Sequence, residues 1–216
     1  MPIERHQAPD LLPFLHARPA GPATAPAPLL LFLHGGRDRG DDLDLLLRWA
    51  PPKQAAERTD LPYHFVAPQI PVDTTWPEHV DALLTLVDHL VATAHVDPRR
   101  IVLAGFSLGA TGAWQIASQH PQRFAGLVAV SGRVTESVNL AALANTPAWV
   151  FHGRRDDKLP SVDTERAIAQ LRSRGGSVRY TLYPEGDHFI GDQAFADGGL
   201  QDWLLSRRSE PLPQAA

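Results

Sequence analysis

Ser107 lies in the pentapeptide GFSLG at 105–109, which fits the pattern G-x-S-x-G. An apolar run leads into it and a helix-like pattern follows, so the chain must reverse direction at the serine. Such a turn forces its central residue into strained backbone angles, and side chains two positions away on either side would collide, which accounts for the two glycines. The hydroxyl lies beside the N–H groups of a helix start, which favour developing negative charge. This spacing predicts a nucleophile at Ser107 rather than a helix cap.

A serine hydroxyl becomes a good nucleophile when a base removes its proton, and histidine titrates in the right range. The sequence has 10 histidines. Where a nucleophile stands at a strand-to-helix turn, an acid and then the histidine follow it along the chain. His188 fits this order, because it follows a strand pattern at 178–184 and precedes a final helix pattern at 193–207. We therefore predict His188 as the base.

The acid that orients the histidine is expected just after the preceding strand pattern, at 148–153. Two neighbouring aspartates follow that strand, Asp156 and Asp157. Their spacing does not choose between them, and Asp163 and Asp187 are weaker alternatives further along the chain. The residues themselves thus predict a serine, histidine and aspartate triad in which the identity of the aspartate stays open.

Chemistry at a carbonyl also requires two N–H donors for the oxyanion. One is the N–H of Leu108, the residue after the nucleophile. The other is expected in the loop after the apolar run LLLFLHGG at 29–36, where Gly35 and Gly36 permit close backbone approach. We predict the Gly36 N–H as this second donor.

The elements that must position these residues alternate along the chain. Short apolar runs, several without period-two alternation, predict strands that are buried on both faces. Strands alternating with helices predict an α/β protein with a mostly parallel central sheet and helices on both faces. The expected strands are 29–36, 64–69, 100–106, 126–132, 148–153 and 178–184, and the expected helices are about 77–95, 108–119, 161–174 and 193–207.

No repeat or interdomain linker interrupts this pattern, so residues 1–216 are predicted to form one domain. Residues 1–28 form an N-terminal edge segment within it. The stretch LLPFLHA at 11–17 predicts an early, antiparallel edge strand. The Pro- and Ala-rich stretch at 17–28 predicts an irregular surface connection.

Composition excludes several classes of protein. The formal net charge is −4 without a clustered basic face, which argues against nucleic acid as a partner. The sequence has no cysteine, no H-E-x-x-H and no G-x-G-x-x-G after the first strand pattern, so neither a metal nor another cofactor is expected. The N-terminus lacks a leader pattern and the longest apolar run, Leu29 to Leu33, is too short for a membrane span. These features favour a cytoplasmic protein and leave monomer and homodimer open.

The chain resembles the bacterial carboxylesterase/phospholipase-like branch of the α/β-hydrolases, related to dienelactone hydrolases, from about residue 29 to 205. LFLHGGRDRGDDL is similar to the family's LHGxGxRGDD, VAPQIP to its APQ strand end, and VDPRRIVLAGFSLGATGAW to its VDxxRIYLxGxSMGGxGTW. FHGRRDDKLP resembles HGxxDxxVP, and YPEGDHF resembles the histidine loop. The resemblance implies the α/β-hydrolase fold and places the triad acid at Asp156.

Two positions depart from the family pattern. Arg37 replaces the second glycine after the His-Gly pair, where a side chain could crowd the oxyanion loop, and Ala110 replaces a glycine after the serine pentapeptide. Gly35, Arg37 and Trp76 are expected to line the substrate cleft.

Together these residues predict a serine hydrolase that cleaves carboxylic esters, with a small-molecule ester as its partner. Only residues 133–146 occupy the place where lids are usually inserted, which is too short for a cap domain. An open cleft and a preference for short to medium acyl chains follow. The alternatives are a thioesterase or peptidase with the same triad, or a binding protein of this fold without catalysis.

Overall fold

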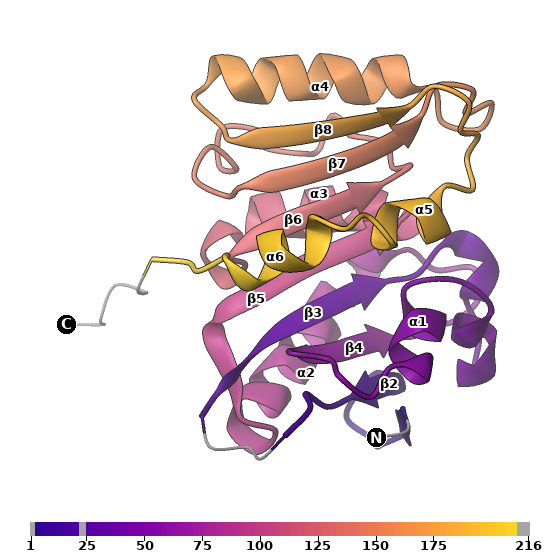
Figure 1. Cartoon of the computed structure of the whole chain (residues 1–216), viewed down its shortest axis with the longest axis vertical. Helices are drawn as coiled ribbons and strands as arrows, with labels where there is room; N and C mark the ends of the chain where they lie inside the picture. Colours follow the sequence, from indigo (N-terminus) through magenta and orange to yellow (C-terminus); the bar gives the residue numbers. More distant parts are fainter. Residues whose placement is uncertain (1–2, 22–24, 211–216) are drawn as a thin grey trace.

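The apolar runs of the sequence form the strands of an eight-stranded sheet in the computed structural model, which describes residues 3–21 and 25–210 (Figure 1). The order across the sheet is β1-β2-β4-β3-β5-β6-β7-β8. The strands are β1 (Glu4–His6), β2 (Phe14–Ala17), β3 (Ala27–Leu33), β4 (His64–Pro68), β5 (Val96–Phe106), β6 (Gly126–Val130), β7 (Ala148–Gly153) and β8 (Val178–Tyr183).

Six neighbouring strands of the sheet are paired in parallel, namely β4, β3, β5, β6, β7 and β8. Their carboxyl ends therefore share one edge of the sheet. Strand β2 pairs antiparallel with both β4 and β1, so one side of the sheet is antiparallel. Every residue of β4, β6 and β7 is buried, as expected for parallel strands covered on both faces. The predicted α/β class with a mostly parallel sheet is confirmed.

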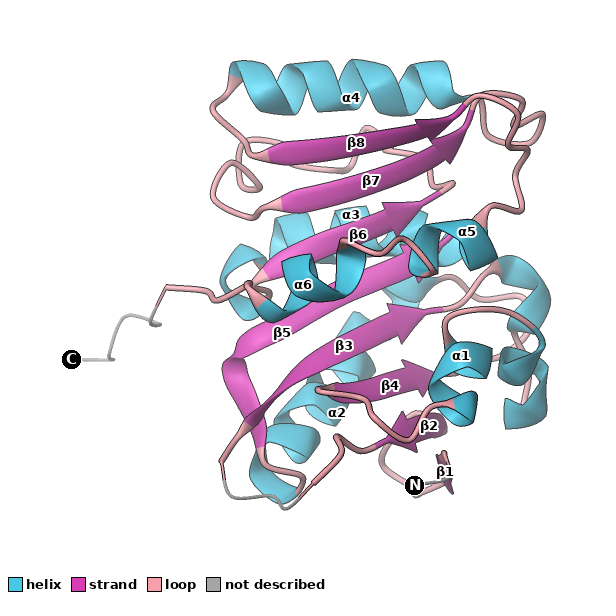
Figure 2. Ribbon diagram, in the orientation of Figure 1, coloured by secondary structure: helices cyan, strands magenta, loops and turns pink. Residues whose placement is uncertain are grey.

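Helices cover both faces of the sheet (Figure 2). Leucines and valines at spacings of three and four pack α2 against the same core as α3 and α4, while α1, α5 and α6 pack against the opposite core. The α-helices are α1 (Pro52–Glu57), α2 (Val80–Thr93), α3 (Leu108–Gln119), α4 (Ser161–Ser173), α5 (Gly191–Phe195) and α6 (Leu200–Leu205). Short 3-10 turns are η1 (Gly36–Asp38), η2 (Leu43–Arg48), η3 (Trp76–His79) and η4 (Pro121–Arg123).

The structure differs from the sequence prediction mainly outside the parallel strands. Strand β1, η2 and α1 are not predicted, and β1 rather than β2 is the edge strand. The single helix expected at 193–207 is two short helices, because Gly198 and Gly199 fall between them and glycine is a poor helix former.

Strand β3 already begins within the predicted surface connection at 17–28, of which residues 22–24 lie outside the described part. The proposal that 1–216 is one domain stays a prediction, since residues 1–2 and 211–216 are also not described.

The segment between β6 and β7, residues 131–147, contains turns and irregular backbone but neither helix nor strand. The segment therefore forms no cap domain. Among the helices in residues 3–21 and 25–210, none has the length and hydrophobicity needed to cross a bilayer.

Candidate active site

Ser107 stands at the tip of a tight turn between β5 and α3. Its φ of 53° and ψ of −114° lie in a region that residues with a Cβ rarely adopt. The turn leaves no room for neighbouring side chains: a Cβ on Gly109 would lie 1.9 Å from the Leu33 carbonyl oxygen, and one on Gly105 would lie 2.4 Å from the Gly109 backbone. The Ser107 N–H donates to the Val130 carbonyl at 2.9 Å, which fixes the turn against β6. The tight turn expected from the pentapeptide is therefore present.

Side chains from three separate loops meet at Ser107. His188 Nε2 lies 2.9 Å from Ser107 Oγ, and His188 Nδ1 lies 2.8 Å from Asp156 Oδ2. His188 and Asp156 are buried, whereas Ser107 is partly exposed to the cleft described below. In this arrangement a neutral imidazole carries its proton on Nδ1 and presents the Nε2 lone pair to the serine hydroxyl. The structure thus brings together the three residues predicted as a triad.

Both carboxylate oxygens of Asp156 accept hydrogen bonds. Its Oδ1 accepts the backbone N–H groups of Lys158 at 2.9 Å and Leu159 at 2.8 Å, which leaves Oδ2 for His188. Burial by itself raises the pKa of Asp156, but the Leu159 and Lys158 N–H groups together with His188 outweigh it and hold the pKa below its usual value. The carboxyl is therefore ionised at neutral pH and can stabilise a protonated imidazole.

The other three candidate aspartates do not bond to His188. Asp157 is exposed and lies 3.9 Å from Lys158 Nζ. Asp163 pairs with Arg166 on the surface of α4. Asp187 accepts the backbone N–H of Phe189. The geometry therefore singles out Asp156 among the alternatives that the spacing leaves open.

A second histidine, His152 at the end of β7, also reaches this carboxylate. Its side chain is fully buried, and its Nε2 lies 2.7 Å from the Leu159 carbonyl and 3.2 Å from Asp156 Oδ2. The Nε2 N–H donates to the Leu159 carbonyl and so ties the aspartate loop to β7. The sequence motifs do not predict a role for His152. The feature that could have indicated one is its position directly before the glycine of FHGRRDDKLP.

His34 fixes the loop that carries Gly36. Its Nδ1 N–H donates to the Gly35 carbonyl at 2.7 Å, and its Nε2 accepts the Ile70 N–H at 3.2 Å. Burial lowers the pKa of His34 to about 4, so the ring is neutral, as these two bonds require. Because the C=O and N–H of a trans peptide point in opposite directions, the Gly35 carbonyl that faces His34 turns the Gly36 N–H away from it.

The two predicted oxyanion donors begin adjacent helical turns. Gly36 is the first residue of η1 and Leu108 the first residue of α3, so neither N–H has an acceptor within its own helix. A Cβ on Gly36 would lie 3.8 Å from the Leu108 side chain, which shows how close the two residues are. Gly36 lines the same cleft as Ser107 and Leu108 follows Ser107 in the chain, so both residues lie next to the serine.

A cleft of about 450 Å³ opens beside these groups. Its lining includes aromatic and charged side chains. These are Trp49, Phe106, Phe189, Arg37, Arg39, Lys158, Asp38 and Asp192. A larger and more open groove of about 1040 Å³ lies next to residues 7–13 and α2, but it holds no member of the triad. The chemistry therefore assigns the candidate active site to the smaller cleft.

Residues 66–198, more than half of the chain, match the phospholipase/carboxylesterase family. The chain belongs to this family. It is 30% identical over 214 residues to NocK of Nocardia uniformis subsp. tsuyamanensis, a protein provisionally named an esterase, in an alignment covering 94% of this chain. The chain spans 60% of the length of NocK.

Solved structures show the same fold. A thermostable esterase superposes with a TM-score of 0.80 at 24% identity, covering 95% of this chain and 62% of that one. The S-formylglutathione hydrolase FrmB of Staphylococcus aureus superposes with a TM-score of 0.71 at 16% identity, covering 94% of this chain and 95% of that one. The predicted α/β-hydrolase fold is confirmed.

In this member of the phospholipase/carboxylesterase family, Arg37 occupies a position that is glycine in the family pattern described above. The side chain is exposed, and its guanidinium carbon lies 5.2 Å from the centre of the Phe189 ring. The guanidinium thus lies over Phe189, and both residues line the cleft. Gly35 and Arg37 both line the cleft, as predicted.

Trp76 does not line the cleft, and the prediction that it does is wrong. The side chain is fully buried against Gly112 of α3, and the indole N–H donates to the His34 carbonyl at 3.1 Å. Its position at the start of η3 places the ring behind the oxyanion loop instead of in front of it. Trp76 therefore supports the backbone of His34 from the protein interior.

Proposed function

We propose that this protein hydrolyses carboxylic esters through an acyl-enzyme formed on Ser107. The observation that carries the proposal is the pair of hydrogen bonds from Ser107 through His188 to Asp156, at 2.9 and 2.8 Å. Membership of the phospholipase/carboxylesterase family supports the same chemistry.

The geometry suggests the following sequence of steps. His188 Nε2 takes the Ser107 proton while Oγ attacks the ester carbonyl carbon, and the carbonyl oxygen becomes an oxyanion that accepts the N–H groups of Gly36 and Leu108. Asp156 stabilises the imidazolium. His188 then gives its proton to the alkoxy oxygen as the carbon–oxygen bond breaks. A water molecule, deprotonated by His188, attacks the acyl-enzyme and releases the acid and the free serine.

Short to medium acyl chains fit the cleft best. Its volume is about 450 Å³, and Trp49 and Phe189 are exposed apolar surfaces against which a short chain can pack. Because residues 131–147 form no cap, activity should not rise sharply when a lipid substrate exceeds its solubility limit.

A thioester or an amide presents the same kind of carbonyl to the same groups, and a protein of this fold can also bind ligands without catalysis. A fluorophosphonate probe tests the last alternative directly, since it labels only an activated serine. We expect labelling at Ser107 and its loss in Ser107→Ala.

The activity itself is tested with 4-nitrophenyl esters from acetate to palmitate, alongside matched thioesters and anilides. We expect the highest kcat/KM for short to medium esters and a loss of at least about a thousandfold in Ser107→Ala. Turnover retained in that variant would show that the serine is not the nucleophile. Faster turnover of the thioesters or anilides would replace the ester proposal with one of its alternatives.

A further inference from the structure

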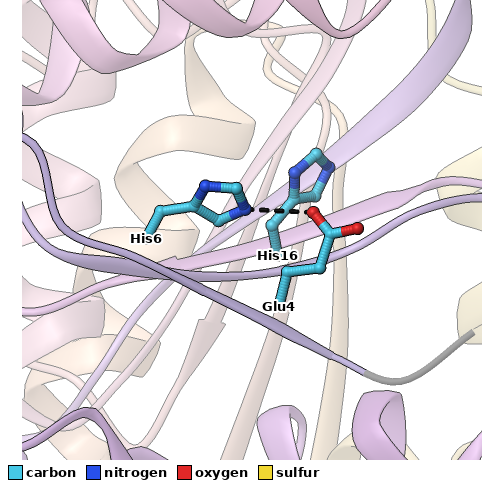
Figure 3. A group of neighbouring side chains, drawn as sticks. All are labelled: Glu4, His6 and His16. Carbon is cyan, nitrogen blue, oxygen red and sulfur yellow. Dashed lines mark hydrogen bonds and ion pairs between the residues drawn. The ribbon is translucent and has the colours of Figure 1, made fainter.

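Three metal-ligating side chains gather at the antiparallel edge of the sheet (Figure 3). Glu4 and His6 are two residues apart on β1 and therefore lie on the same face. The strand register places His16 of β2 directly opposite Glu4. One ligand atom from each residue lies within 4.8 Å of the other two. Strand pairing alone brings these side chains together, at the opposite end of the strand order from β8.

Two imidazoles and a carboxylate are a set of ligands that zinc accepts. Zinc bonds of 2.0–2.1 Å in a tetrahedral site put neighbouring donor atoms about 3.4 Å apart. His6 Nε2 and Glu4 Oε2 are already separated by 3.1 Å. The third donor lies within 4.8 Å of the other two, so it is at most about 1.5 Å from the spacing that zinc requires.

Both imidazoles are held in place by their surroundings. The His6 ring stacks on Phe14, with ring centres 4.6 Å apart and planes 7° from parallel. His16 is only 1% exposed, and its Nε2 lies 3.0 Å from His64 Nδ1 on β4. A metal-binding histidine commonly donates its other ring N–H to a second residue, and His64 can accept it here. With its proton on Nε2, directed at His64, His16 keeps the lone pair of Nδ1 for a cation.

Arg18 is the competing partner of Glu4. Its Nε lies 3.2 Å from Oε1, and its Nη2 lies 3.3 Å from Oε2. A carboxylate offers about four acceptor positions, so Oε1 can keep Arg18 while Oε2 binds a cation. The nearby positive charge weakens the attraction for a divalent ion without removing any of the three donors.

We propose that Glu4, His6 and His16 bind one zinc ion per chain, with water completing the coordination. The ion would fasten β1, which is only three residues long, to β2. This role is independent of ester hydrolysis at Ser107.

The test uses the full chain, stripped of metal with a chelator and titrated with Zn²⁺ by calorimetry and with Co²⁺ by its visible absorption. We expect one ion per chain and a tetrahedral Co²⁺ spectrum that Zn²⁺ abolishes. His6→Ala and Glu4→Gln should each weaken binding at least about tenfold. Both side chains are about one-third exposed, so these variants disturb the packing less than a change at buried His16 would.

His89→Ala, at an exposed position on α2, is the matched control and should bind like the parent. The proposal is overturned if the chain shows no saturable zinc binding. It is also overturned if either His6→Ala or Glu4→Gln retains the parent affinity, because the ion would then lie elsewhere, for example at His188.

Discussion

Two regions of this molecule place histidines beside a carboxylate in opposite ways. At the carboxyl edge of the parallel strands, His188 contacts Asp156 because two loops converge after β7 and β8. At the antiparallel edge, His6 contacts Glu4 because both side chains point to the same face of one strand. In the first region loops set the geometry, and in the second the register of paired strands sets it.

The two carboxylates also differ in their burial and in their hydrogen-bond partners. Asp156 is buried and receives two backbone N–H groups on one oxygen, while its other oxygen lies 2.8 Å from His188 and 3.2 Å from His152. Glu4 is at the surface and shares its oxygens between Arg18 and His6. The first arrangement keeps the imidazole in one tautomer and one orientation, whereas the second leaves the carboxylate open to exchange of partners.

The largest expected effect comes from removing the charge at the first carboxylate. Asp156→Asn should lower kcat for short esters by about 10⁴-fold, because an amide there no longer enforces the Nδ1–H tautomer or stabilises the imidazolium. Asp157→Asn, one residue away and exposed, should change kcat less than twofold. Steady-state kinetics on both variants checks the assignment. A larger loss in Asp157→Asn than in Asp156→Asn would reverse it.

The sequence alone predicts the first region far better than the second. Ser107, His188 and Gly36 each lie in a local stretch whose spacing has a steric or chemical reason, so their positions follow once the strands are recognised. The choice of Asp156 over Asp157 depends on which carboxyl the loop turns inward, and spacing does not carry that information. Trp76 is mispredicted because an aromatic residue before a helix packs as readily behind a loop as in front of it.

The second region has no local signal. Glu4, His6 and His16 come from short strands whose pairing is set by contacts between separate segments, and β1 itself has no hydrophobic pattern. Likewise His34 and His152 act through partners that only the tertiary structure supplies. Sequence motifs thus identify groups whose geometry is built locally, and they miss groups that are assembled across strands.

Both regions also contain neutral buried histidines, which should make the fold sensitive to acid. The pKa is lowered to about 3 for His16 and to about 4 for His34 and His64, in each case mainly by burial. Below pH 6.5 the unfolded chain binds protons that the folded chain excludes, so the free energy of unfolding falls from about pH 6.5 toward pH 4. His16 alone should account for about 2 kcal/mol of this loss at pH 5.

Urea unfolding at pH 7.5 and pH 5 measures this loss, and His16→Gln should make the difference between the two pH values smaller. His89→Ala removes an exposed histidine and should leave the difference as it is in the parent. An unchanged difference in His16→Gln would mean that His16 is protonated equally in the folded and unfolded chains.

A smaller effect is expected from the arginine that pairs with Glu4, the carboxylate of the second region. Arg18→Gln removes the positive charge that pairs with Glu4, and zinc affinity should rise roughly fivefold at low ionic strength. Arg5→Gln is the matched control, because Arg5 points to the other face of β1 and pairs with Asp44. Calorimetric titration of both variants gives the comparison. Weaker binding in Arg18→Gln would show that the arginine helps to build the site instead of opposing the ion.

The smallest expected effect lies at the position where the first region departs from its family pattern. Arg37→Ala should change kcat for 4-nitrophenyl acetate less than about threefold, because the guanidinium packs over Phe189 with the modest energy of an exposed cation–π contact. The oxyanion loop should keep its shape in this variant, since His34 holds the Gly35 carbonyl from the opposite side. A loss of thirtyfold or more in kcat would instead place Arg37 among the groups that shape the oxyanion donors, and the glycine of the family pattern would then mark a functional difference rather than a tolerated substitution.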